Sequence, residues 1–167
     1  LRGKSSEIYQ CGAELIGSGS IRSDLEIMEM AASSLERISD GAGYRLELCH
    51  IGYFKALMES LGADEETQEE IRRNIEQKNF ASLNDLLEQF PNNPAAAALK
   101  YLPRLFGGEE VFEQAYALFD DKNARESLDY LRNIYNSLQQ LGLGDKVIID
   151  LGLVNQAEYY TGIILRG

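Results

Sequence analysis

The 167-residue sequence predicts an α+β protein in which a sheet is interrupted by a block of helices. Two observations carry this prediction. Short apolar or alternating segments, typical of strands, occur near both ends of the chain. Between about Ala63 and about Leu141, apolar residues instead recur at helical spacing, with no strand signal. The length suits one domain with a substantial core.

The first strand is expected from Glu7 to Ile16. One face would carry Tyr9, Cys11, Ala13 and Leu15, and the other Ile8, Gln10, Gly12, Glu14 and Ile16. The second face places a glycine between polar residues, which is unusual for a core but allows a ligand to approach the backbone. The sequence 17–20, with alternating Gly and Ser, is expected to end this strand.

A helix should follow from Ser23, the expected N-cap, to about Ile38. Its core stripe would be Leu25, Met28, Ala32, Leu35 and Ile38. A second strand is expected over Tyr44–Ile51, and a short helix over Gly52–Leu61 with Gly62 as its C′ residue.

Five helices are expected in the middle block: Asp64–Lys78, Ser82–Phe90, Pro94–Phe106, Glu109–Phe119 and Ala124–Leu141. The last has the clearest stripe, formed by Leu128, Leu131, Ile134, Tyr135 and Leu138. We therefore divide the chain into a first core part (1–62), a helical insertion (63–141) and a return to the core (142–167).

The chain is expected to return to strand at Lys146–Leu151 and again from about Glu158 to Arg166. In a strand, Tyr159 and Tyr160 would lie on opposite faces. Glu158, Tyr160 and Gly162 would share a face, as Gln10, Gly12 and Glu14 do. If both strands lie in one sheet, these faces form a shallow polar pocket suited to a small polar ligand. The alternative is that two amphipathic strands face solvent.

Composition excludes several classes of function. A net charge of −11 offers no generic basic surface for nucleic acid. The apolar runs are too short to span a membrane, and no secretory h-region follows the first residues. The chain does not begin with Met, and we expect it to be part of a longer one. Cys11 and Cys49 are too few for a disulfide framework, which favours the reducing cytoplasm and a role as small buried hydrophobes.

Most local motifs have ordinary structural explanations. The acidic run of Glu65, Glu66, Glu69 and Glu70 fits a solvated helix rather than a metal site. Asp120 and Asp121 fit a turn or cap pair, and His50 fits a hydrogen-bonded residue at a strand end. We find no phosphate-binding glycine loop and no metal or nucleophile motif, and we predict no cofactor.

Two segments resemble the histidyl-tRNA synthetase family. Residues 9–17, YQCGAELIG, resemble the end of motif 2, where Gln and Glu four residues apart contact histidine. Residues 153–162, LVNQAEYYTG, resemble the histidine-binding signature, usually LVRGLDYYTG. Residues 49–57 resemble the strand and helix that follow motif 2. The resemblance implies part of a class II synthetase core with an antiparallel sheet, and histidine binding by Gln10, Glu14, Tyr159 and Tyr160.

The departures from the family pattern bear on catalysis. Asn155 stands where the signature has its catalytic arginine, and Ser6 where motif 2 has one. Adenylate formation builds negative charge that fixed cations stabilise, so loss of these arginines predicts no catalytic residues. The family's motif 1, the first half of motif 2 and motif 3 have no counterpart in these residues.

Ligand residues kept beside a lost arginine resemble the pattern of a paralogous family, the regulatory subunits of ATP phosphoribosyltransferase. That resemblance implies a non-catalytic protein of histidine biosynthesis that binds the catalytic subunit, senses histidine and forms a homodimer in its full-length form. The alternatives are a divergent histidyl-tRNA synthetase, or a synthetase-like domain with another partner.

Overall fold

The computed structural model describes residues 12–154 and 159–167. Its helices are α1 (Ile21–Ile38), α2 (Ile51–Leu61), α3 (Glu65–Glu76), α4 (Phe80–Leu87), α5 (Pro94–Tyr101), α6 (Glu110–Leu118) and α7 (Lys122–Gln140), with short 3₁₀ turns at Leu102–Arg104 and Gly144–Lys146. Its strands are β1 (Leu46–His50), β2 (Phe106–Gly107), β3 (Val147–Asp150) and β4 (Ile163–Arg166). The predicted α+β class is confirmed.

The sheet is mixed, so the expected antiparallel sheet is wrong in part. The strand order is β2-β3-β1-β4. β4 pairs antiparallel with β1, and β2 antiparallel with β3, whereas β1 and β3 run parallel. The chain leaves β1 through helices α2 to α7 before it enters β3, and such a long crossover lets two strands run in the same direction.

The expected first strand is wrong for the residues that the structure describes. Residues 12–16 form no strand, and Tyr159–Gly162 precede β4 without joining the sheet. β1, at the centre, is already paired along both edges, by β3 and β4. A strand is stable only where its backbone groups find a partner, and residues 12–16 find none among the described strands. The rest of that expected strand, including Gln10 and Cys11, lies outside the described residues.

Helix ends follow local chemistry. α1 begins two residues before the expected Ser23, because Ser20 is the N-cap and accepts a hydrogen bond from the Ser23 N–H (3.4 Å). α5 ends at Tyr101, short of the expected Phe106, because Pro103 lacks an N–H and the chain continues as a 3₁₀ turn. Gly62 ends α2 in the left-handed conformation (φ 67°), as predicted.

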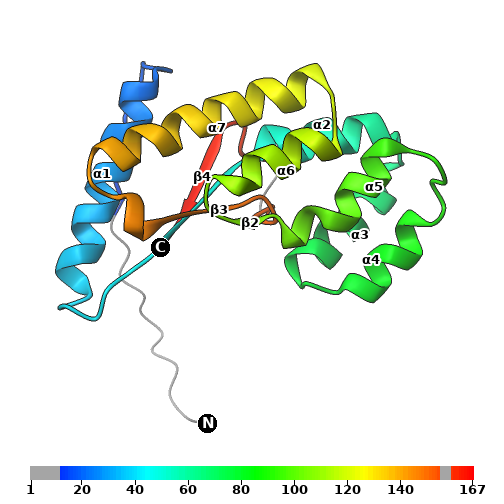
Figure 1. Cartoon of the computed structure of the whole chain (residues 1–167), viewed down its shortest axis with the longest axis horizontal. Helices are drawn as coiled ribbons and strands as arrows, with labels where there is room; N and C mark the ends of the chain where they lie inside the picture. The colour runs from blue at the N-terminus through cyan, green and yellow to red at the C-terminus, as the bar shows by residue number, and fades with distance from the viewer. Residues whose placement is uncertain (1–11, 155–158) are drawn as a thin grey trace, which may run out of the picture.

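α7 lies along α2 and β1 and also contacts α1 and α6, so it links the sheet to helices on both sides (Figure 1). The predicted stripe is confirmed: Leu128, Leu131, Ile134, Tyr135 and Leu138 are all buried. Asp121 caps α7 by accepting from the Ala124 N–H (3.0 Å), as expected of the Asp120–Asp121 pair.

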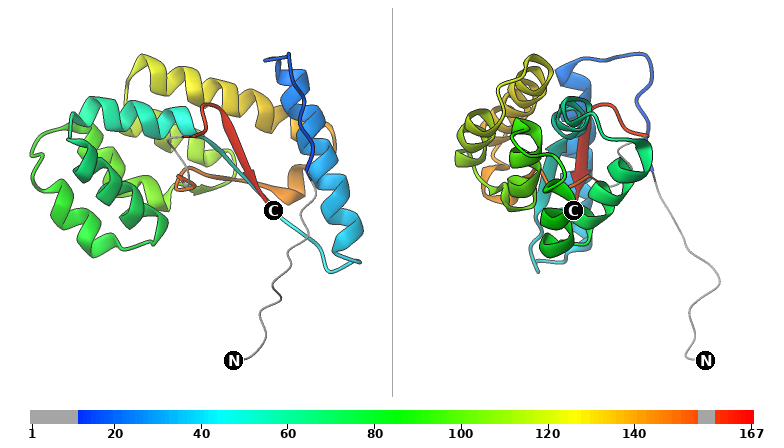
Figure 2. Two further views of the ribbon diagram at one scale, coloured as in Figure 1. Left: turned by 180° about the vertical axis from the view of Figure 1, so that it is seen from behind. Right: turned by 90° about the vertical axis from the view of Figure 1, so that its right-hand side faces the viewer.

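α1 packs on α7 at the end of the molecule opposite α3, α4 and α5, as Figure 1 and the left view of Figure 2 show. Its predicted core stripe holds for Met28 and Ala32, which are buried, and for Leu25 and Leu35, which are partly buried. Ile38 is 78% exposed, so its expected place in the core is wrong. Ile38 is the last residue of α1, where the helix has passed the elements that it covers.

Charged side chains connect the three longer strands on one face of the sheet. Arg166 of β4 pairs with Glu47, its register partner in β1, and lies 3.8 Å from the Asp150 carboxylate of β3. Asp150 is buried and accepts a hydrogen bond from the Gly152 N–H (2.9 Å). Burial raises the pKa of Asp150, and the hydrogen bond from Gly152, followed by the nearby Lys78 and Arg166, opposes that rise.

Candidate functional site

The double-tyrosine segment lies against the first turns of α2. The Ile51 N–H donates to the Gly162 carbonyl (3.0 Å), and the Lys55 ammonium donates to the Tyr160 carbonyl (2.7 Å). Ile51 and Lys55 are four residues apart, so they lie on the same face of α2. The main chain of residues 160–162 is therefore fixed to one helix face immediately before β4 begins.

The two tyrosine rings contact each other. Their centroids are 5.2 Å apart in an edge-to-face arrangement. The expectation that they lie on opposite faces of a strand is therefore wrong, because these residues are not in a strand. Tyr159 is 80% exposed and Tyr160 41% exposed, so the aromatic pair is accessible from solvent. Exposed aromatic rings with a polar tip are well suited to ligand contact.

Cavities lie on both sides of α2. One, of about 610 Å³, lies between α2 and α3 and is lined by Phe54, Lys55, Met58, Glu59, Glu65, Gln68, Glu69 and Arg72. The other, of about 390 Å³, lies between α2 and α7 and is lined by residues that include His50, Lys55, Glu59, Ser127 and Tyr130. Lys55 and Glu59 line both cavities, so the helix face that holds the tyrosine segment also forms a wall of each.

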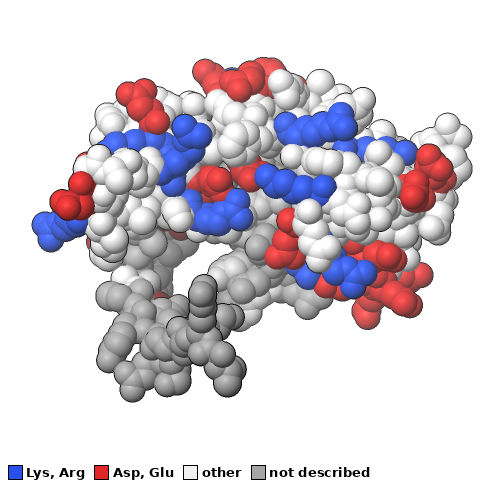
Figure 3. Space-filling model, turned by 90° about the horizontal axis from the view of Figure 1, so that it is seen from below, with Lys and Arg blue, Asp and Glu red and all other residues white. Residues whose placement is uncertain are grey.

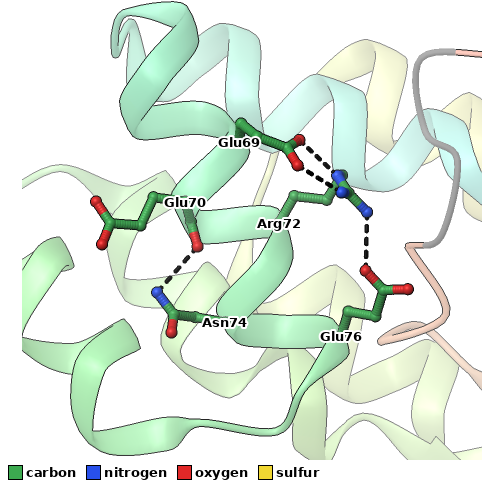
Figure 4. A network of polar contacts seen from close by, with 5 residues as sticks. All are labelled: Glu69, Glu70, Arg72, Asn74 and Glu76. Carbon is green, nitrogen blue, oxygen red and sulfur yellow. Dashed lines mark hydrogen bonds and ion pairs between the residues drawn. The ribbon is translucent and has the colours of Figure 1, made fainter.

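The α3 wall of the larger cavity is built from charges that are already paired (Figure 4). Arg72 donates to both carboxylate oxygens of Glu69 (2.7 and 2.6 Å) and to Glu76 (2.9 Å). The buried Asn74 donates to the Glu70 carbonyl (2.9 Å). The guanidinium of Arg72 is therefore committed within α3. The acidic run is confirmed as a solvated helix face.

His50 closes the smaller cavity at the end of β1. Its Nδ1 accepts a hydrogen bond from the Gly52 N–H (3.1 Å), so the imidazole caps α2, as expected for a strand-end histidine. Burial lowers the pKa of His50, an effect that Asp24 opposes. A Cβ at Gly52 would lie 2.3 Å from the Ser127 Oγ and 2.9 Å from the His50 Nδ1, so a larger residue there would displace these side chains and disturb the cap.

Tyr130 links this cavity to α1. Its ring lies edge-on to the His50 imidazole (5.7 Å between centroids), and its hydroxyl donates to Asp24 (2.7 Å). Burial, followed by the Asp24 hydrogen bond, raises the pKa of Tyr130 to about 12. The described contacts of His50 and Tyr130 are thus a helix cap, an aromatic contact and a hydrogen bond to α1, which fit a structural role.

Of the other two predicted ligand residues, Gln10 and Glu14, the structure describes Glu14. Glu14 is exposed. Within residues 12–154 and 159–167, no hydrogen bond or ion pair links Glu14 to Tyr159 or Tyr160. Its neighbours Gly12 and Ala13 instead line an apolar cavity of about 480 Å³ beside α1 and β4. Gln10 and Asn155 lie outside the described residues, as does Glu158.

The sequence did not single out Lys55, although it belongs to the segment that resembles the family. A lysine at an outward position of a helix is common, and its hydrogen bond to Tyr160 joins residues 105 positions apart. Only the tertiary structure brings this pair together.

The remaining features concern metal binding, membrane-spanning helices, the surface charge and Cys49. In the described part of the chain, no cluster of His, Cys, Asp or Glu could hold a metal ion, and no helix is long and apolar enough to cross a bilayer. On the face shown in Figure 3, Lys and Arg side chains lie among Asp and Glu rather than in a continuous basic surface. Cys49 is buried as predicted, and burial raises the pKa of its thiol.

The chain is similar to curated proteins along its whole length. It is 40% identical to the ATP phosphoribosyltransferase regulatory subunit of Clostridium kluyveri and 37% identical to that of Clostridium botulinum strain Langeland, with 100% of this chain aligned in both. The chain spans only 43% and 40% of the length of these relatives.

Solved structures share the fold. A Bacillus halodurans protein described as an ATP phosphoribosyltransferase regulatory subunit/histidyl-tRNA synthetase superposes with a TM-score of 0.79 at 26% identity, over 90% of this chain and 40% of that one. A chain of the ATP phosphoribosyl transferase (HisG:HisZ) complex from Thermotoga maritima shares the fold with a TM-score of 0.68 at 20% identity, over 88% of this chain and 51% of that one.

A family model also matches the chain. The model described as histidyl-tRNA synthetase matches residues 2–167, which is nearly the whole chain. That match includes both segments whose motifs resemble the family, around Glu14 and around Tyr160. The chain belongs to the histidyl-tRNA synthetase family.

Proposed function

We propose that this protein is a non-catalytic regulatory subunit of ATP phosphoribosyltransferase that binds the catalytic subunit and senses histidine. The observation that carries the proposal is the 40% identity, over the whole of this chain, to a relative named as that regulatory subunit. A regulatory subunit acts by binding a catalytic one, so the partner follows from the same observation. We further propose a homodimer and a cytoplasmic location.

Histidine is the proposed ligand. It carries an imidazole that both donates and accepts hydrogen bonds, an ammonium group and a carboxylate. The Tyr160 hydroxyl suits an imidazole nitrogen, Glu14 suits an imidazole N–H or the ammonium group, and Gln10 suits the ammonium group. The exposed tyrosine pair supports this assignment, because its polar edges are accessible to a ligand.

The carboxylate of histidine is the weakly held group. Asn155 stands where the family signature has arginine, so one charge-assisted hydrogen bond worth about 1.5–3 kcal/mol is missing. Affinity should therefore be lower than that of a synthetase. A sensor must respond to changing concentration rather than remain saturated, and weak binding suits that role.

The test is reconstitution of the complete protein with the catalytic subunit. We expect the phosphoribosyltransferase activity of the complex to require this subunit and to be inhibited by histidine. Glu14→Ala and Tyr160→Phe should each shift inhibition to higher histidine concentration. Glu29→Ala, at an exposed position on α1, and Tyr101→Phe, which is 51% exposed, are matched controls that should behave as wild type.

Two outcomes would contradict the proposal. Catalytic activity that is independent of this subunit would refute the regulatory role. Histidine inhibition that is unchanged in both the Glu14 and the Tyr160 variants would place the histidine site elsewhere, for example on the catalytic subunit.

A further inference from the structure

We propose that Lys55 is a positioning residue that holds the Tyr159–Tyr160 segment in the conformation that binds the ligand. This inference rests on the proposed role of those tyrosines in histidine binding. Lys55 would not contact histidine itself. It would act through the main chain of Tyr160, to which its ammonium donates at 2.7 Å.

The geometry gives α2 two points of attachment to the segment. The Ile51 N–H holds the Gly162 carbonyl at 3.0 Å, and Lys55, one turn further along the same helix face, holds the Tyr160 carbonyl. Gly162 directly precedes β4, whose first residue pairs with His50 in the sheet. The hydrogen bond at Gly162 therefore lies directly beside the last strand pair. The hydrogen bond at Tyr160 lies two residues further from the sheet.

Tyr160 depends on this contact because the sheet does not reach it. β4 pairing begins at Ile163, so residues 159–162 have no strand neighbour. Tyr159 is 80% and Tyr160 41% exposed, and their rings pack on each other, so the main chain has a large part in setting their position. A loop already held in its bound conformation loses less conformational entropy when a ligand binds.

The Lys55 ammonium is available for this role. Glu59 lies one turn along α2 and shares both cavities with Lys55, yet among the described residues Lys55 forms no ion pair. The ammonium donates to the Tyr160 carbonyl, and hydrogen bonds from a charged donor are stronger than neutral ones. A shorter or uncharged side chain would not reproduce this bond.

The experiment is calorimetric titration of L-histidine into the complete subunit in complex with its catalytic partner. We expect Lys55→Met to weaken histidine binding by about three- to tenfold, in line with loss of one partly exposed charge-assisted bond. Lys55→Arg should restore most of the affinity, because it keeps a charged donor. Lys100→Met removes the same charge from α5 and should bind as wild type.

A double-mutant cycle tests whether Lys55 acts through Tyr160. If it does, Lys55→Met should cost less affinity in a Tyr160→Phe background than in the wild type. Hydrogen exchange gives a second readout that does not need histidine: amide exchange around Thr161 and Gly162 should be faster in Lys55→Met and near normal in Lys55→Arg.

The outcomes separate this inference from the proposed function. If Tyr160→Phe weakens histidine binding and Lys55→Met does not, the role of Lys55 is overturned and the histidine site stays in place. Equal losses from Lys55→Met in both backgrounds would also overturn it. A wild-type complex that binds no histidine would refute the proposed function, and the inference with it.

Discussion

His50 shows how one side chain can connect a strand, a helix and a cavity. It ends β1, caps α2 through Nδ1 and contacts the Tyr130 ring of α7. The cap requires a nitrogen lone pair, so the imidazole must be neutral at Nδ1. Protonation would remove the acceptor and place a positive charge at a helix N-terminus, where positive charge is unfavourable.

This arrangement predicts a pH-dependent stability. The folded-state pKa of His50 is lowered below its ordinary value of 6.5, chiefly by burial. The unfolded chain therefore binds a proton at a pH where the folded chain does not, and stability falls as the pH drops through 6.5 toward the folded pKa. His50→Asn retains a capping oxygen without a titrating group, so it should flatten this slope in urea unfolding between pH 7.5 and 5.5.

The chain contains only 1 histidine, so no other imidazole contributes to the pH dependence of stability. At pH 7.5, where His50 is neutral, His50→Asn should change the free energy of unfolding by less than about 1 kcal/mol, and His50→Ala should cost about 1 kcal/mol as a lost cap. An unchanged slope in His50→Asn would show that another group causes the pH dependence.

At the scale of elements, α7 and α3 are stabilised by different forces. α7 buries a continuous apolar stripe against α2 and β1. α3 has a strongly polar outer face, where exposed ion pairs around Arg72 add to a few buried contacts from Ile71 and Ile75. Burial of apolar area contributes far more to stability than exposed ion pairs do.

For α7 we predict that Leu131→Ala lowers the free energy of unfolding by about 2–5 kcal/mol, because it leaves a cavity in the core. Leu131 is fully buried, with 0% of its surface exposed. Leu141→Ala is the matched control, because Leu141 follows the end of α7 and is 50% exposed, so it should cost far less. Similar losses for the two variants in urea unfolding would contradict the proposed packing.

For α3 we predict that Arg72→Gln lowers the free energy of unfolding by less than about 1 kcal/mol despite two ion pairs. The partner carboxylates of Glu69 and Glu76 are 47% and 35% exposed, so water and salt screen the interaction. The difference in unfolding free energy between wild type and variant should shrink further when NaCl is raised from about 0.05 M to about 1 M, because this change shortens the screening length several-fold. A loss of several kcal/mol would show that Arg72 has a structural role beyond these pairs.

At the scale of the whole molecule, the helices between β1 and β3 are part of the same core as the sheet. The Tyr53 hydroxyl of α2 donates to the Ala115 carbonyl of α6 (3.1 Å), and the Leu151 N–H donates to the Leu105 carbonyl (3.0 Å). The division into a core (1–62 and 142–167) and an insertion (63–141) stays a prediction.

The function proposed for the whole protein predicts that it does not activate histidine with ATP. We expect no histidine-dependent ATP–pyrophosphate exchange by the complete protein, because Asn155 carries no charge where the family has its catalytic arginine. The control is an authentic histidyl-tRNA synthetase in the same assay. Exchange at a rate typical of enzymes, with kcat on the order of 1–10³ s⁻¹, would support the alternative, a divergent synthetase.

The sequence by itself determined the elements whose signals are local. Helical periodicity predicted α7 with all five residues of its stripe, Gly62 predicted the end of α2, and Asp121 the cap of α7. The motifs around Glu14 and Tyr160 pointed to the family that the comparison then showed. Each of these signals is carried by residues close together in the chain, so no knowledge of distant contacts is needed.

The tertiary structure alone decided which segments pair. Whether an alternating segment becomes a strand depends on a neighbouring strand for its backbone, and residues 12–16 and 159–162 pair with none of the described strands, although their patterns predicted strands. Strand pairing between distant segments also makes β1 and β3 parallel and adds the two-residue β2 to the sheet beside β3. It also brought Lys55 to the Tyr160 carbonyl, because a hydrogen bond between residues so far apart in the chain exists only once the helices have packed.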